Sequence, residues 1–115
     1  MIDLSVVISK SPQPGFQGAE AFDLAMAGAV FDWEIALFFI GDGLAHCFLN
    51  PTSEATGNLS KRWLSAKLFG VERMYRLNTE WPEGIELGPI ANQVLAISVT
   101  ELQSLLAQSR RVMVI

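Results

Sequence analysis

The stretch LSVVI, residues 4–8, indicates the class of fold that this chain adopts. Four of its five side chains are apolar and three are β-branched, so the run is too continuous for a half-exposed strand. Residues 34–43, EIALFFIGDG, contain a second run of the same kind. Strands that are apolar along their whole length are typical of a parallel sheet covered on both faces, so we expect an α/β fold.

Between these two runs the hydrophobic period changes to that of a helix. Residues 9–18, SKSPQPGFQG, carry two prolines and two glycines and are predicted to form a loop. A helix of about four turns is predicted from Ala19, with large apolar residues at helical spacing: Phe22, Met26, Val30 and Trp33. Its second face consists of small residues that permit close packing: Ala21, Ala25 and Gly28.

The middle of the chain predicts two further helical pieces. Residues 43–49, GLAHCFL, are short and apolar and predict one or two helical turns before the loop NPTSEATG. Asn58 or Ser60 is suited to cap the next helix, and Gly70 stands where a C-terminal glycine ends it. Four apolar residues are predicted to share one face of that helix: Leu59, Trp63, Ala66 and Phe69.

The last third predicts three more strands and one helix. Residues 71–77, VERMYRL, are expected as a strand near an edge, because charged residues interrupt the apolar run. QVLAIS and RRVMVI, residues 93–98 and 110–115, predict the fourth and fifth strands. The helix between them has capping-box spacing at Thr100 and Gln103, and its core face is predicted to comprise Leu102, Leu105 and Leu106. We therefore expect a three-layer α/β/α sandwich with five strands, in a single domain over residues 1–115.

In parallel sheets, ligands and catalytic groups collect at the carboxyl ends of the strands. That rule singles out three predicted loops, residues 9–18, 41–50 and 78–89. The first has no glycine-rich phosphate-binding spacing, and its prolines remove backbone donors, so nucleotide or flavin binding is not expected. A phosphoacceptor site is excluded as well, because Ser9, Lys10 and Ser11 stand where it needs a pair of carboxylates.

Composition excludes further classes of function. The formal net charge of −4 argues against direct nucleic-acid binding, and Lys61, Arg62 and Lys67 are interpreted as the solvated face of a helix. No apolar run approaches the roughly 20 residues that span a bilayer, and the start lacks a signal peptide, so we expect a cytoplasmic protein without membrane contact. Half of the residues are hydrophobic and 17% are charged, which indicates an apolar surface that binds partners.

His46 and Cys47, the only histidine and the only cysteine of the chain, are the obvious catalytic candidates. Neighbouring residues on a helix point about 100° apart, so His46 is poorly placed to take the thiol proton. The apolar flanks favour an inert, structural Cys47, since such surroundings raise a thiol pKa. Asp42 is interpreted as the cap of the short helix beginning near Leu44, because no second ligand lies near it in the sequence.

Three stretches resemble the TusC/DsrF-like family, the TusC or DsrF subunits of the bacterial sulfur-relay complexes TusBCD and DsrEFH. These are FFIGDGLAHCFLNP at residues 38–51, the opening VVISKSPQPGFQGAEAFDLAMAGAVFD, and the tail LAISVTELQSLLAQSRRVMVI. The most specific residues are Phe38 and Phe39 followed by Asp42 and Gly43. The resemblance covers nearly the whole chain and implies a small α/β/α fold with a mainly parallel five-stranded sheet.

The resemblance also implies a function. The TusBCD complex is a dimer of heterotrimers that passes sulfur as a cysteine persulfide toward 2-thiolation of the tRNA wobble uridine. Its persulfide cysteine belongs to the TusD subunit and follows the third strand, where this chain has YRLNTEW and no cysteine. We therefore expect a non-catalytic structural subunit bound to TusB-like and TusD-like paralogues, with a homo-oligomer as the alternative state of the isolated chain. No residue is assigned a catalytic, cofactor-binding or metal-binding role, and no activity is expected from the chain alone.

Three alternatives remain open at the level of the sequence. The first is a persulfide-carrying sulfurtransferase that uses Cys47. The second is a subunit of a dissimilatory sulfur-oxidation complex, and the third is a small-ligand binding module at the strand ends. An obligate interface is predicted to use Trp63, Trp81 and the long segment 78–89. A slow, unshifted Cys47 thiol is the expectation that separates the structural subunit from the carrier.

Overall fold

The computed structural model describes residues 1–10, 18–48, 63, 65–71, 73–78, 83–84, 87–88 and 90–115. Five strands form one sheet in the order β4-β3-β2-β1-β5, and all four pairings are parallel. The strands are β1 (Leu4–Ile8), β2 (Ile35–Phe39), β3 (Arg73–Leu77), β4 (Leu95–Ile97) and β5 (Val112–Val114). The predicted α/β fold with five strands is confirmed.

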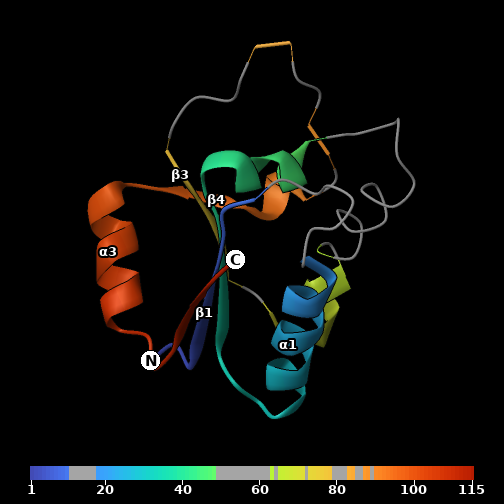
Figure 1. The fold of residues 1–115 in the computed structure, drawn as a ribbon, viewed down its shortest axis with the longest axis vertical. Coiled ribbons are helices and arrows are strands. Elements are labelled where there is room, and N and C mark those ends of the chain that lie inside the picture. Colours follow the sequence, from blue (N-terminus) through green and yellow to red (C-terminus); the bar gives the residue numbers. More distant parts are fainter. Residues whose placement is uncertain are drawn as a thin grey trace.

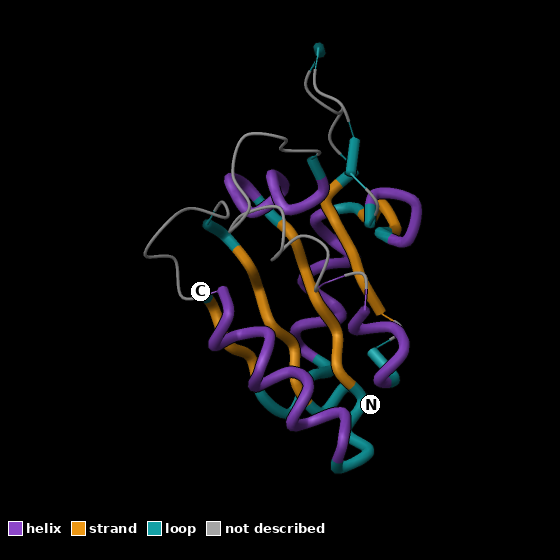
Figure 2. Tube along the Cα trace, turned by 90° about the vertical axis from the view of Figure 1, so that its right-hand side faces the viewer, coloured by secondary structure: helices purple, strands orange, loops and turns teal. Residues whose placement is uncertain are grey.

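Helices cover both faces of this sheet, which gives the three predicted layers. Helix α1 (Gly18–Val30) lies on one face beside the 3₁₀ turn η2 (Lys67–Phe69), and helix α3 (Val99–Ala107) lies on the other face (Figure 1). Each face has its own core, a larger one under α1 and a smaller one under α3. Viewed at right angles, the strands run side by side between the helices (Figure 2).

The two runs that indicate the fold class are the two inner strands. All five residues of β1 and all five of β2 are buried, and the strands pair in register from Leu4 with Ile35 to Ile8 with Phe39. Their continuous apolar character follows from this central position, because both faces of each strand are covered. Strand β3 lies one place in from the edge, which β4 occupies.

Helix α1 ends earlier than its hydrophobic period predicts. The amide of Trp33 donates to the carbonyl of Gly28 and that of Asp32 donates to Ala29, which is the hydrogen-bond pattern of a Schellman motif. Asp32 takes the left-handed conformation there, with φ of 61°. The predicted helical spacing therefore does not extend to Trp33, which lies beyond the end of the helix and contacts Arg111. Val30, the last residue of the helix, is 70% exposed.

Two of the three residues of the predicted small-residue face of α1 pack closely as expected, and the side chain of the third, Ala21, lies outside the described part. Ala25 is fully buried and Gly28 is buried, whereas Phe22 and Met26 pack at the margin of the same core. A Cβ atom on Gly28 would lie 3.0 Å from the Ile35 side chain, so a small residue permits the close approach of helix and sheet.

A second Schellman motif ends the helical segment that contains Trp63. Gly70 has φ of 99°, and the amide of Val71 donates to the carbonyl of Ala66. Val71 thereby returns to the core. Phe69 is 56% exposed whereas Trp63 and Ala66 are buried, so the prediction that Phe69 shares their face is wrong. The predicted caps Asn58 and Ser60, together with Leu59, Lys61 and Arg62, lie outside the described residues.

Helix α3 carries a capping box, two residues earlier than predicted. The amide of Glu101 donates to Ser98 Oγ at 3.1 Å, and the amide of Ser98 donates to Glu101 Oε1 at 3.3 Å. Thr100 is therefore not the cap, and that prediction is wrong because the helix begins at Val99. The predicted core face is confirmed, since Leu102, Leu105 and Leu106 pack against the smaller core.

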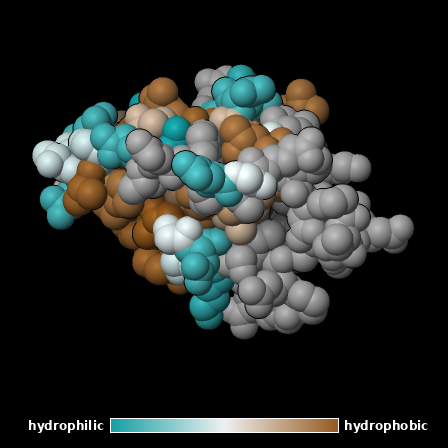
Figure 3. Space-filling view, turned by 90° about the horizontal axis from the view of Figure 1, so that it is seen from above, coloured by the Kyte–Doolittle hydropathy of each residue, from teal (hydrophilic) through white to brown (hydrophobic). Residues whose placement is uncertain are grey.

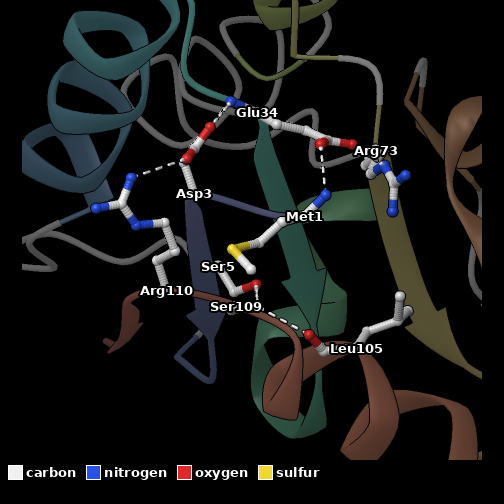
Figure 4. A network of polar contacts seen from close by, with 8 residues as sticks. All are labelled: Met1, Asp3, Ser5, Glu34, Arg73, Leu105, Ser109 and Arg110. Atoms are coloured by element: carbon white, nitrogen blue, oxygen red, sulfur yellow. Dashed lines mark hydrogen bonds and ion pairs between the residues drawn. The ribbon is translucent and has the colours of Figure 1, made fainter.

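Polar side chains tie the strands together at the amino edge of the sheet (Figure 4). Asp3 Oδ2 accepts from the amide of Glu34 at 2.8 Å, and Glu34 Oε1 lies 2.8 Å from Arg73 Nε. Buried Ser5 shares a 2.6 Å hydrogen bond with Ser109, whose hydroxyl donates to the backbone of α3. This edge is thereby closed by structural contacts, and the loops of the opposite, carboxyl edge carry the candidate site.

Candidate functional site

The carboxyl edge brings together parts of the three loops that the sequence singles out. The 3₁₀ helix η1 (Gly41–Cys47) follows β2 and lies directly against the end of β1, where a Cβ atom on Gly43 would approach the Ile8 carbonyl oxygen to 1.8 Å. The amide of Gly88 donates to the Cys47 carbonyl at 2.7 Å, and Phe48 forms an isolated bridge with Leu87. Residues 11–17, 49–50, 79–82, 85–86 and 89 of these loops lie outside the described residues.

His46 is fully buried at this edge and is held from both sides of its ring. The indole Nε1–H of Trp63 donates to His46 Nδ1 at 3.0 Å. Because Trp63 can only donate, Nδ1 is an acceptor and the ring proton lies on Nε2. His46 Nε2 then donates to the carbonyl oxygen of Lys10, also at 3.0 Å. His46 thus joins the exit of β1, η1 and the helical segment of Trp63.

Burial keeps the His46 ring neutral. Desolvation lowers its pKa from 6.5 to about 4, and the hydrogen bond to the Lys10 carbonyl offsets only part of this effect. Protonation at Nδ1 would also set two N–H groups against each other, since the Trp63 indole has no lone pair to offer. A neutral ring with both nitrogens engaged is a structural group and is not placed to accept a proton from a nucleophile.

Cys47 is also fully buried, and its thiol is held in the protonated form. Burial raises the pKa of Cys47 from 9.0 to about 12, although the positive charge of Arg76 lowers it to a smaller degree. Neither nitrogen of the adjacent His46 is open to the thiol, because Trp63 and Lys10 occupy them. The sequence expectation of an unshifted pKa is therefore corrected upward, while the expectation of an inert thiol is strengthened.

Asp42 does not cap the short helix as predicted. Helix η1 begins at Gly41 rather than near Leu44, its N-cap residue is Ile40, and no side-chain hydrogen bond caps it. The Asp42 carboxylate is exposed in the first turn. Within the described part of the chain, no three His, Cys, Asp or Glu residues gather closely enough to hold a metal ion.

Trp63 has a different role from the one that the sequence suggests. Its side chain is fully buried, packs edge-on against Phe22 and Phe39, and donates to His46, so the prediction that it faces a partner is wrong. Trp81, the other predicted interface tryptophan, lies outside the described residues. Sequence reasoning missed the contact between Trp63 and His46. The sequence indicates only that the indole N–H of a buried tryptophan needs a hydrogen-bond acceptor, without showing which residue provides it.

The sequence resemblance implies that the stretch at the end of β3 is where another subunit of the resembled complexes carries its reactive cysteine. Tyr75, in the middle of β3, stacks on Phe38 with 5.2 Å between ring centroids. Near the end of the strand, Arg76 Nη1 donates to the carbonyl of Leu77. The stretch YRLNTEW contains no cysteine, and its residues 79–81 lie outside the described part. The only sulfur nucleophile in the sequence is therefore the buried Cys47.

Comparisons with known proteins identify a relative in sequence and a neighbour in fold. No family model matches the chain. The protein TusC homolog of Pseudomonas aeruginosa is 31% identical over 77 residues, which cover 63% of this chain and 62% of that protein, so the match spans less than two thirds of the relative's length. The crystal structure of the ychN protein from E. coli superposes with a TM-score of 0.68 and 15% identity over 100% of both chains, which shows the shared fold. None of the described helices has the length and apolar character needed to cross a membrane.

Proposed function

We propose that this chain is a TusC-like subunit of a sulfur-relay complex and that it supports sulfur transfer without carrying the sulfur itself. Its similarity to the protein TusC homolog supports the assignment to this type of subunit. In this proposal it works in the cytoplasm, bound to TusB-like and TusD-like paralogues in a dimer of heterotrimers. The pathway served is 2-thiolation of the tRNA wobble uridine.

The burial and raised pKa of Cys47 are the main support for a subunit that does not carry the sulfur itself. Persulfide transfer requires a thiolate that reaches the outer sulfur of the donor persulfide, hence an accessible thiol of low pKa. The single cysteine of this chain is fully buried, and its pKa is raised to about 12. Sulfur that passes through such a complex is therefore held by a cysteine of another subunit.

Exposed apolar side chains support a role as an assembly component. Large hydrophobic residues that are more than half exposed occur on both faces and both edges of the described structure: Met1, Val30, Phe31, Leu68, Phe69, Leu95, Val99 and Val114. Subunits of permanent complexes bury such residues against their partners. A supporting subunit would contribute surface and stability in this way.

The test is reconstitution with the two paralogues. The chain, a TusB-like protein and a TusD-like protein are co-expressed, the complex mass is measured by light scattering, and 2-thiouridine in tRNA is quantified by mass spectrometry. We expect one complex, loss of 2-thiouridine when this chain is omitted, and unchanged 2-thiouridine with Cys47→Ala. A monomeric chain without paralogue binding would refute the proposal. Loss of sulfur oxidation with intact tRNA thiolation would assign the complex to the dissimilatory pathway.

A further inference from the structure

The two outermost strands of the sheet, β4 and β5, differ in how well they are protected against pairing with a strand of another molecule. Strands β4 and β5 are equally short, with three residues each. Arg110 and Arg111 directly precede β5, whereas β4 lies in the uncharged stretch QVLAISVT, residues 93–100. Charged side chains at an edge are a common device that prevents strand pairing between molecules. Strand β4 lacks that device.

The backbone of β4 presents polar groups on its outer side. The amide of Asn78 donates to the Ile97 carbonyl at 2.8 Å, so the polar groups of Ile97 point toward β3. Successive residues of a strand direct their N–H and C=O groups to opposite sides, so those of Ala96 point away from the sheet. Ala96 is exposed. The edge thus offers one outward donor and one outward acceptor at its central residue.

Apolar side chains flank this outward backbone. Leu95 pairs with Tyr75 and therefore lies on the α3 face of the sheet, where it is 63% exposed. Val99, at the start of α3, is 55% exposed. Seen from the carboxyl edge, hydrophobic surface lies among hydrophilic residues in the part of the molecule that Figure 3 colours. An extended partner that pairs with β4 would cover Leu95 at the same time.

We propose that β4 pairs antiparallel with β4 of a second copy of this chain, about a two-fold axis at Ala96, so that two sheets join into one. The two Ala96 residues then exchange both N–H···O bonds, and Leu95 lies opposite Ile97 of the other copy on the α3 face. A two-fold interface brings each residue near its own equivalent, so charged residues would repel there. The uncharged stretch 93–100 avoids that repulsion, whereas β5 would bring Arg110 and Arg111 of both copies into one interface.

The expected dimer is weak. One pair of backbone hydrogen bonds and a short apolar strip form a contact smaller than the roughly 800 Å² per partner of a typical stable interface. Association therefore depends on concentration, with a dissociation constant in the range of about 10 µM to 1 mM. This inference goes beyond the proposed function and does not depend on it.

Sedimentation velocity of the full chain over that concentration range tests the pairing. The mass is expected to rise from 12.6 kDa toward twice that value. Ala96→Pro removes the outward N–H and leaves the hydrogen bonds to β3, so we expect a dissociation constant at least about tenfold higher. Hydrogen exchange supplies a second readout, because the Ala96 amide should become protected as concentration rises.

The matched control is Val114→Pro at the opposite edge. The amide of Ile115 donates to the Val7 carbonyl, so the alternate residue Val114 directs its N–H outward as Ala96 does. This variant should dimerise like the parent chain. If circular dichroism shows that Ala96→Pro is unfolded, Ala96→Lys replaces it and places like charges on the two-fold axis.

Three outcomes would overturn the inference. The first is a monomer at every concentration, and the second is association that Ala96→Pro and Ala96→Lys leave unchanged. The third is a monomeric chain whose binding to a paralogue is lost with Ala96→Lys, which would assign the β4 edge to that paralogue. If the chain forms no homodimer but still binds the paralogues, the inferred β4 pairing is refuted and the proposed function is not.

Discussion

Acidification should destabilise the protein through His46. In the folded chain Trp63 and Lys10 hold the ring neutral and desolvated, and its pKa is about 4. In the unfolded chain the same ring titrates at 6.5. The unfolded state therefore binds more protons than the folded state below pH 6.5, so the free energy of unfolding falls as pH falls and stops falling below about pH 4.

The size of the effect follows from the two pKa values. Relative to pH above 7.5, this single group lowers the free energy of unfolding by about 2 kcal/mol at pH 5 and by about 3 kcal/mol at pH 4. No discount for solvent screening applies, because His46 is fully buried. Domains of this size are usually stable by only about 5–15 kcal/mol, so the loss is a large fraction of the total.

Urea unfolding at pH 7.5, 5 and 4, followed by far-ultraviolet circular dichroism, measures this loss. His46→Gln is the matched control, because the amide offers a donor and an acceptor without titrating. Carboxylates that titrate in the same range affect both proteins equally, so the difference between their pH dependences isolates His46. Parent and variant profiles that run parallel between pH 7.5 and 4 would refute the assignment of a buried neutral histidine.

Four substitutions test the local backbone. Gly43→Ala should lower the free energy of unfolding by about 3 kcal/mol or more in urea titrations, because its Cβ atom would lie 1.8 Å from the Ile8 carbonyl oxygen; a change below 1 kcal/mol would contradict this packing. Asp32→Gly should raise the melting temperature by a few degrees, equivalent to about 0.5–1 kcal/mol, since glycine adopts the left-handed conformation without strain, and a lower melting temperature would argue against the motif. Ser98→Ala should cost about 1 kcal/mol whereas Thr100→Ala costs almost nothing, and the reverse order would restore the cap predicted from the sequence.

The inner part of the fold was predictable because burial leaves a direct trace in the sequence. Strands β1 and β2 are apolar at nearly every position and lie in the middle of the sheet. The core face of α3 follows from helical spacing alone. These features depend only on which residues avoid water, and a single sequence records that.

The predictions from the sequence were wrong at positions where the chain leaves a helix or a strand. The helical period runs on from Met26 through Val30 to Trp33, but a left-handed aspartate ends the helix first. Asp32 in that role is not predictable from spacing, because glycine is the usual residue there. Similarly, the side chains of Ser98 and Thr100 can both accept a hydrogen bond at a helix N-terminus. Ser98 is the cap because β4 ends at Ile97 and α3 begins at Val99.

The candidate site was predictable in its chemistry but not in its contacts. Apolar flanks indicate that Cys47 is buried, and the structure places it in the core with a raised pKa. The contact between His46 and Trp63 joins residues 17 positions apart, and no local pattern signals it. The strand order is equally hidden, because it depends on which elements meet in three dimensions.

The alkylation rate of Cys47 in the native chain, measured against pH with iodoacetamide, tests the supporting role most directly. We expect a rate far below that of the urea-unfolded chain and no titration below about pH 9, since burial raises the thiol pKa from 9.0 to about 12. A native thiol that reacts as fast as the unfolded one and titrates near or below pH 8.5 would contradict it. Cys47 would then be an accessible sulfur carrier.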